Sequence, residues 1–136
     1  MAATSAASEP SAILARLTQE HNSSNTLDVH AYVPALYRHL AACDVAVIQG
    51  GLTTTMELTA NRRPFLYFPL GHHFEQNFHV PHRLARYGAG RRMNFASSGP
   101  DMIAAALAEE IGRTVESRPV DPAAAGRVAD SLAELL

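Results

Sequence analysis

The residues best suited to chemistry lie together, after a short apolar run and before a segment with helical apolar spacing. They are Gln49, Gly50, Gly51, Thr53, Thr54 and Glu57. This order predicts a strand, a glycine turn and the start of a helix, because glycine lets the backbone turn tightly and approach a ligand. The first N–H groups of a helix point at whatever lies ahead of it, and phosphate is a common anion there. The stretch therefore predicts an anion site.

One turn further into this helix, the carboxylate of Glu57 does not suit phosphate itself. It suits accepting hydrogen bonds from a diol, such as the hydroxyls of a ribose. Thr53 and Thr54 add hydroxyls near the phosphate position, where threonine also serves as a plain helix cap. The stretch thus combines a predicted phosphate site with a carboxylate suited to a diol.

The composition is that of one ordinary globular domain. The chain has 136 residues, of which 47% are hydrophobic and 18% charged, and its net charge is −2. That charge gives no support for nucleic-acid binding. The single Cys43 excludes an intrachain disulfide and fits a reducing compartment. We expect a cytoplasmic protein, since no apolar run reaches the length of a membrane span and residues 1–10 lack the pattern of a secretory signal.

Short apolar strands alternate with helices along most of the chain. We expect residues 1–26 to be a flexible segment with one short helix over Ser11–Glu20, and residues 27–136 to be the folded domain. The predicted strands are Leu27–Val33, Val45–Ile48, Phe65–Phe68 and Arg91–Phe95. Helices are predicted to begin at Pro34, at Leu52 and at Asp121-Pro122. A further helix begins at Glu75 and stops at Gly88, and another is capped by Ser98 and stops at Gly112. This alternation indicates an α/β fold with a parallel, Rossmann-like sheet and flanking helices.

The helical spacing also predicts which side chains face the core. These are Leu36, Leu40 and Cys43, then Leu52, Met56 and Ala60, then Met102, Ile103, Leu107 and Ile111, and finally Val128, Leu132 and Leu135. Only three or four strands can be counted, so the fold is a partial or minimal version of a doubly wound domain.

Further features follow the glycine turn in a fixed order. In sequence they are Gln49-Gly50-Gly51, Glu57, Pro64, Pro69, Glu75-Gln76 and Leu84-Ala85-Arg86-Tyr87-Gly88-Ala89-Gly90. This series resembles the C-terminal, donor-binding half of glycosyltransferases of the two-Rossmann-domain (GT-B) type, such as the UDP-glycosyltransferases and the MurG-like enzymes. In that family a strand leads to His-x-Gly and a Glu, then to two prolines, an Asp/Glu-Gln pair and a Gly-Ala-Gly. The resemblance covers roughly residues 27–95.

The resemblance implies hexosyl transfer from a nucleoside-diphosphate sugar, a UDP- or dTDP-sugar, with no metal or other cofactor. The turn at Gly50-Gly51 and the hydroxyls of Thr53 and Thr54 would hold the diphosphate. Glu57 would bind the ribose, and Glu75 and Gln76 would bind the sugar. Two positions depart from the pattern. Gln49 replaces the usual His and cannot be a cation, and Arg62-Arg63 precedes Pro64 where the family has Gly.

The family places the acceptor site and the general base in an N-terminal domain that the first 26 residues cannot supply. The acceptor side would then come from a missing domain or a partner subunit, and a membrane-bound partner would place the chain at the membrane periphery. Three other readings stay open: a non-catalytic donor-binding subunit of a split transferase, a fragment of a sugar-nucleotide epimerase, and a remnant that no longer folds alone. Unpaired sheet edges are compatible with a homo-oligomer.

A metal site is the weaker interpretation of the histidine-rich stretch. His72, His73, His79 and His82 lie close in sequence, but Pro81 interrupts the helical spacing and no carboxylate or cysteine pattern completes a site. We expect a loop with exposed histidines, one of which could approach the donor.

Overall fold

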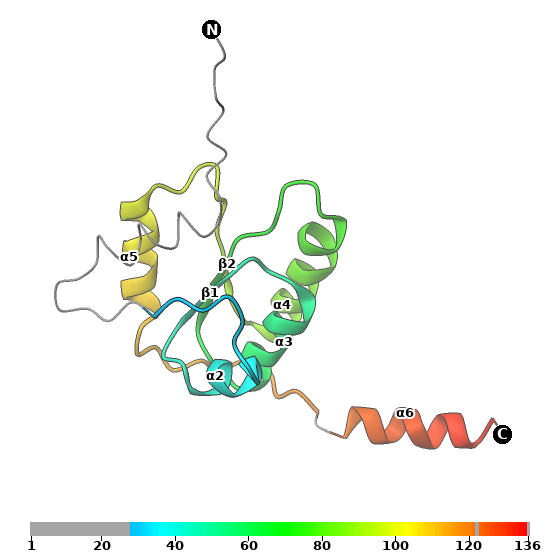
Figure 1. Cartoon of the computed structure of the whole chain (residues 1–136). Helices are drawn as coiled ribbons and strands as arrows, with labels where there is room; N and C mark the ends of the chain where they lie inside the picture. The colour runs from blue at the N-terminus through cyan, green and yellow to red at the C-terminus, as the bar shows by residue number, and fades with distance from the viewer. Residues whose placement is uncertain (1–27, 122, 136) are drawn as a thin grey trace, which may run out of the picture. The chain divides into compact units, whose positions relative to one another are not determined.

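The computed structural model describes residues 28–121 and 123–135, and residues Ala35–Leu136 form one compact unit. In chain order its elements are the helix α2 (Leu36–Ala42), the strand β1 (Ala46–Ile48), α3 (Leu52–Ala60), β2 (Phe65–Tyr67), the π-helix η1 (Glu75–His79), α4 (Val80–Tyr87), β3 (Arg91–Arg92), α5 (Pro100–Glu110) and α6 (Ala124–Ala133) (Figure 1).

The three strands form one parallel sheet in the order β1-β2-β3. Ala46 pairs with Phe65 and Ile48 with Tyr67, while Leu66 pairs with Arg91 on the other edge of β2. Parallel neighbours need a crossover, and here α3 and the η1–α4 pair provide it. The predicted α/β class with a partial, Rossmann-like sheet is confirmed.

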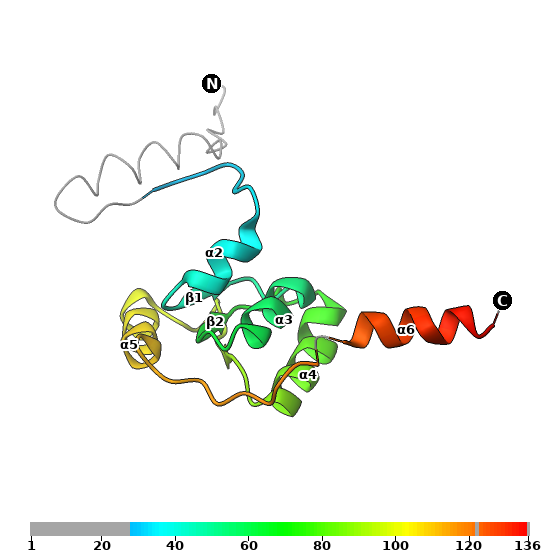
Figure 2. The ribbon, with the colours of Figure 1, turned by 90° about the horizontal axis from the view of Figure 1, so that it is seen from below.

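The two faces of the sheet are covered by different helices. Figures 1 and 2 show α3 and α4 on one side of the sheet and α5 on the other. Phe65 and Tyr67 of β2 belong to the core with Leu58 of α3 and Leu84 of α4. Leu66 points to the opposite face and has no exposed surface. The central strand is therefore buried on both faces, as parallel strands usually are.

The predicted strand at Leu27–Val33 is wrong for the residues that the structure describes, because 28–33 contain no strand. A weakly alternating segment becomes a strand only where another strand pairs with it. The sheet of the described part consists of β1, β2 and β3, and residues 28–33 pair with none of them. The predicted helix over Ser11–Glu20 lies outside the described residues.

The inward face of α3 differs from the prediction. The buried side chains are Thr55, Leu58 and Thr59. Of the predicted residues, Leu52 is partly buried and packs against the core, Met56 is half-buried and Ala60 is exposed. Each threonine hydroxyl donates to a carbonyl of its own helix: Thr59 to the Thr55 oxygen at 2.7 Å, and Thr55 to the Leu52 oxygen at 2.8 Å. With its hydroxyl satisfied in this way, a threonine can be buried like a small apolar residue.

On α5 the buried residues are Ala106 and Glu110, whereas Met102 and Ile111 are exposed. Glu110 tolerates burial because its Oε1 accepts a hydrogen bond from Arg113 Nη1 at 2.9 Å. The predicted cap at Ser98 is also wrong, since Gly99 is the N-cap and Pro100 opens the helix. Proline fits there because its missing N–H would have had no partner in the helix.

The predicted inward residues of α6, Val128, Leu132 and Leu135, are all exposed. No residue of α6 is buried in the part of the chain that the structure describes.

The single helix predicted from Glu75 to Tyr87 begins as a π-helix. The Val80 N–H donates to the Glu75 oxygen, five residues earlier, instead of to a residue four earlier. Pro81 lies in the next turn, where it has no N–H to donate and its ring crowds the carbonyl four residues before it. The wider turn accommodates that ring. The helix stops as predicted at Gly88, which has a left-handed φ of 65°.

Gly90 is expected to be more sensitive to substitution than Gly88. Both have positive φ, so alanine at either costs about 1–2 kcal/mol of strain. A Cβ on Gly90 would also lie only 2.6 Å from Cζ of Phe65, whereas a Cβ on Gly88 would meet no atom within 4 Å. Overpacking should add about 1–3 kcal/mol for Gly90→Ala. Urea unfolding of the two variants tests this, and equal losses of stability would contradict the packing explanation.

Candidate functional site

The loops that follow β1 and β2 meet at the carboxyl edge of the sheet. Gly50 is buried, with a φ of +100° that favours glycine. A Cβ on Gly50 would lie 3.1 Å from Cδ2 of Tyr67 and 3.8 Å from the backbone nitrogen of Pro69. This close approach brings the glycine turn after β1 against the start of the loop after β2.

The N-terminus of α3 opens directly from this turn. Gly51 is its N-cap residue, with extended backbone (φ −66°, ψ 145°), and no side chain of the described residues caps the helix. A Cβ on Gly51 would meet nothing within 4 Å, so the space in front of the helix is open. Thr53 is exposed and Thr54 is half-buried. The N–H groups of the first turn are therefore accessible to an outside acceptor.

Thr55 fixes the geometry of this helix end. It has no exposed surface, and its hydroxyl is 3.0 Å from the Gly51 oxygen and 2.8 Å from the Leu52 oxygen. The Thr55 N–H also donates to the Gly51 oxygen at 3.1 Å. These contacts hold the glycine turn from inside the helix.

Glu57 is half-buried and lies four residues after Thr53 on the same helix. Residues four apart share one face of a helix, so the Glu57 carboxylate follows the exposed Thr53 hydroxyl along that face. Thr53 and Glu57 therefore lie in line along α3, beginning at the helix end.

The loop after β2 is fixed by two side chains of η1. Gln76 is buried, and its Oε1 accepts the Leu70 N–H at 2.9 Å. Asn77 Nδ2 donates to the carbonyls of Leu70 at 2.6 Å and His73 at 3.0 Å. Glu75, at the start of η1, is half-buried. The role of Asn77 was not predicted from the sequence, although an amide side chain soon after a loop is a common source of such contacts.

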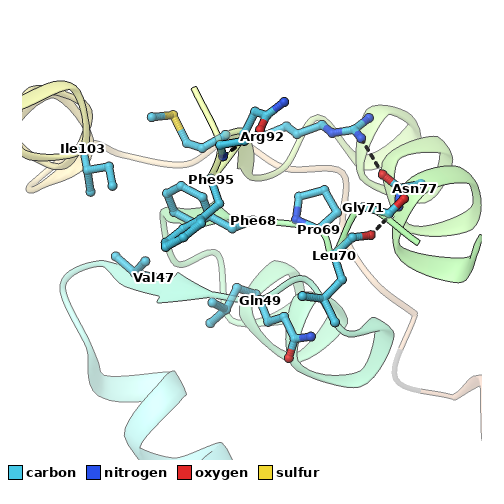
Figure 3. A pocket seen from close by; sticks show the side chains of 14 residues that line it. Val47, Gln49, Phe68, Pro69, Leu70, Gly71, Asn77, Arg92, Phe95 and Ile103 are labelled. Carbon is cyan, nitrogen blue, oxygen red and sulfur yellow. Dashed lines mark hydrogen bonds between the residues drawn. The ribbon is translucent and has the colours of Figure 1, made fainter. Parts of the chain in front are cut away.

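An apolar pocket of about 960 Å³ opens beside these loops. Figure 3 shows Val47, Phe68, Phe95 and Ile103 grouped on one side of it and Gln49 on another. Arg92 contributes the charge of its rim, and the Arg92 Nη2 donates to Asn77 Oδ1 at 2.9 Å. Of the eight residues that the sequence predicts to bind the donor, Gln49 lines this pocket. The other seven do not line it: Gly50, Gly51, Thr53, Thr54, Glu57, Glu75 and Gln76.

The sequence alone does not indicate this pocket, because its walls come from residues far apart in the chain. Phe95 follows β3 and packs edge-on against Phe68, with ring centroids 6.3 Å apart. A single aromatic residue after a short edge strand carries no signal by itself.

The described residues contain neither a metal-binding cluster nor a helix that could span a membrane. No group of three or more His, Cys, Asp or Glu is arranged to hold a metal ion. No helix in this part of the chain is long and apolar enough to cross a membrane.

Tyr67, which packs beneath Gly50, should make stability depend on alkaline pH. Burial raises the pKa of its hydroxyl above 10.0, and the charge of Arg92 opposes part of that rise. The folded chain keeps the proton where the unfolded chain would lose it. The stabilisation is thus complete below about pH 10 and falls as the pH rises through the folded pKa. Urea unfolding at neutral and alkaline pH should show a smaller alkaline loss for Tyr67→Phe than for the native chain. Equal losses would contradict this role.

Replacing Gln76 should loosen the loop after β2. Gln76→Met keeps the side-chain size but removes the acceptor of the Leu70 N–H, so we expect a loss of about 1 kcal/mol of unfolding free energy. Gln49→Met is the matched control, because Gln49 is exposed at the end of β1. A Gln76→Met chain as stable as the control would show that this hydrogen bond contributes nothing.

Comparison with known proteins adds one observation. No protein-family model and no curated protein matches the chain. Among solved structures, the crystal structure of the glycotransferase of kitacinnamycin matches with 29% identity and a TM-score of 0.50. The match covers 79% of this chain and 25% of that one, so the chain spans about a quarter of the length of its structural neighbour. The likeness supports a glycosyltransferase fold for this chain.

Proposed function

We propose that this chain is the donor-binding domain of a glycosyltransferase of the GT-B type and binds a UDP- or dTDP-sugar. The observation that carries the proposal is the open N-terminus of α3, which Gly51 leaves without a side-chain cap at the carboxyl edge of a parallel sheet. Ligands of open α/β sheets bind at that edge. The likeness to part of a glycotransferase supports the same assignment.

In this proposal the donor diphosphate binds in front of Gly51. The N–H groups of the first turn donate to its oxygens, and the hydroxyls of Thr53 and Thr54 add to them. The helix end contributes about 0.3–2 kcal/mol, and each hydrogen bond to a charged oxygen about 1.5–3 kcal/mol. The amide of Gln49 donates from the end of β1. Such donors stabilise the negative charge that builds on the departing diphosphate.

The ribose and the sugar occupy the two flanks of the diphosphate. The Glu57 carboxylate accepts hydrogen bonds from the ribose hydroxyls. Glu75 and Gln76 bind hydroxyls of the sugar, with Gln76 offering its amide nitrogen because its oxygen already accepts the Leu70 N–H. The loop after β2 is already held by Gln76 and Asn77, so Glu75 and Gln76 are kept in place without a large entropic cost on binding.

Hexosyl transfer also needs an acceptor site and a general base, and we assign both to a polypeptide beyond this domain. The chain spans only 25% of the glycotransferase that it matches, which favours a donor-binding domain or subunit with no transfer activity alone. A cytoplasmic location, with membrane contact only through a partner, is part of the same proposal.

Isothermal titration of the chain with UDP, dTDP, GDP and ADP tests the proposal. We expect selective binding of UDP or dTDP. Glu57→Ala should weaken it by about 10- to 100-fold, the value of hydrogen bonds to a charged acceptor. Gly51→Val should weaken it as well, because its side chain fills the open space in front of the helix, while its negative φ accepts valine without strain.

Asp44→Ala is the control, since Asp44 is an exposed carboxylate that precedes β1, at the opposite end of the strand. It should bind nucleotide like the native chain. The proposal fails if a cooperatively folded chain binds none of the four nucleotides, or if Glu57→Ala and Gly51→Val both bind as the native chain does.

A further inference from the structure

Within residues 28–121 and 123–135, one face of β1 is left without cover. Val47 is 51% exposed, whereas Leu66, its paired residue on β2, is fully buried beneath α5. Beside Val47 lie Phe68, Ile103 and Phe95, and Phe95 is 79% exposed. We call Val47, Phe68, Phe95 and Ile103 the β1 face (Figure 3). A parallel strand normally has both faces covered, so this apolar surface is suited to a further layer of structure.

The helix α6 carries an exposed apolar face that could cover such a surface. Val128 and Leu132 lie on one face of this helix and Leu135 lies two residues beyond its end, and their exposures are 60%, 58% and 81%. No residue of α6 is buried in the described part of the chain. A helix of 10 residues is marginal in water unless its apolar face packs against something. Packing of its apolar face on another apolar surface would therefore stabilise α6.

The charges of the two surfaces also match. Asp130 lies on α6 and Glu134 caps its C-terminus, while the guanidinium of Arg127 is already paired with Asp121. At the rim of the β1 face the charged residue is Arg92, whose Nη2 contacts the neutral amide of Asn77. The helix thus brings net negative charge toward a rim that carries a positive one.

We propose that two copies of this chain associate reciprocally, with α6 of each copy packed on the β1 face of the other. Val128, Leu132 and Leu135 would enter the pocket of about 960 Å³ beside Val47 and Phe95. A helix of 10 residues is about 15 Å long, enough to lie across such a pocket. The reciprocal arrangement closes on itself as a two-fold dimer, so it does not grow into filaments. Gly51 and Glu57 of the proposed donor site lie outside this pocket, and Gln49 is shared between the two sites.

Analytical ultracentrifugation of the full chain over a wide concentration range tests the dimer. The native chain should sediment as a concentration-dependent dimer. Leu132→Glu and Val47→Glu should each raise the dissociation constant by more than about tenfold, because each places an unpaired charge in an apolar contact. Ala133→Glu is the matched control, since the neighbouring residue adds the same charge on the polar side of α6 and should leave the dimer intact.

Mixing the two variants distinguishes this arrangement from other dimers. Val47→Glu keeps its α6 and Leu132→Glu keeps its β1 face, so the mixture should associate where each variant alone does not. A dimer that survives Val47→Glu would mean that the α6 helices pair with each other. One that survives Leu132→Glu would mean that strand edges pair. Either result overturns the proposal.

A native chain that stays monomeric at every concentration also overturns it, and would mean that α6 or the β1 face packs within its own chain or on another protein. Thermal unfolding checks that each variant still folds. If Val47→Glu does not, Phe95→Ser takes its place, because Phe95 is the most exposed member of the β1 face. Nucleotide titration of Leu132→Glu, which leaves the pocket and Gln49 unchanged, should still show binding, so the dimer and the donor site can fail independently.

Discussion

The parallel pairing of β2 between β1 and β3 is the constraint on which the rest of this domain depends. Parallel strands cannot be joined by a hairpin, so the chain must return along a helix each time. Both returns lie on the same face, and the carboxyl ends of all three strands meet at one edge. The glycine turn, the loop of η1 and the pocket are neighbours because of this geometry and not because of their spacing in sequence.

The side chains of β2 also explain two of the glycines. Phe65 and Tyr67 point to the same face, with ring centroids 6.2 Å apart. Backbone passes close to each ring: Gly90 beside Phe65 and Gly50 beside Tyr67. Any larger residue would push the chain away from the sheet. The same two aromatic rings therefore shape both the start of β3 and the turn in front of α3.

Much of the element order could be predicted from the sequence, because apolar runs, prolines and glycines carry local information. The stop at Gly88 and the strand at Phe65 follow from such signals. The inward faces of α3 and α5 could not be predicted in this way. Thr55 and Thr59 look polar but satisfy their hydroxyls within the helix, and Glu110 is buried because Arg113 pairs with it. These outcomes depend on contacts that form only in the folded chain.

The candidate site also combines features with a local sequence signal and features that depend on the folded chain. The turn at Gly50-Gly51 was visible in the sequence, since glycine in a strand-to-helix turn has a local meaning. The loop contacts of Asn77 and the walls of the pocket were not, because Phe68 and Phe95 come together only through the sheet. In the same way the sequence pattern of Val45–Ile48 suggested burial on both faces, while Val47 lies half-exposed at an edge.

The π-helix η1 imposes a limit on the length of this segment. Gln76 and Asn77 hold the loop on one side of it, and α4 is packed into the core by Val80 and Leu84 on the other. The turn of η1 already holds one residue more than an ordinary helical turn, so deleting that residue would restore an ordinary helix and leave both anchors in place. Inserting a further residue would instead rotate everything before it by about 100°. Gln76 would then turn away from Leu70. A stretch with exposed residues such as Phe74 and Phe78 would usually be free to gain residues during evolution, but here substitutions should be accepted and insertions should not.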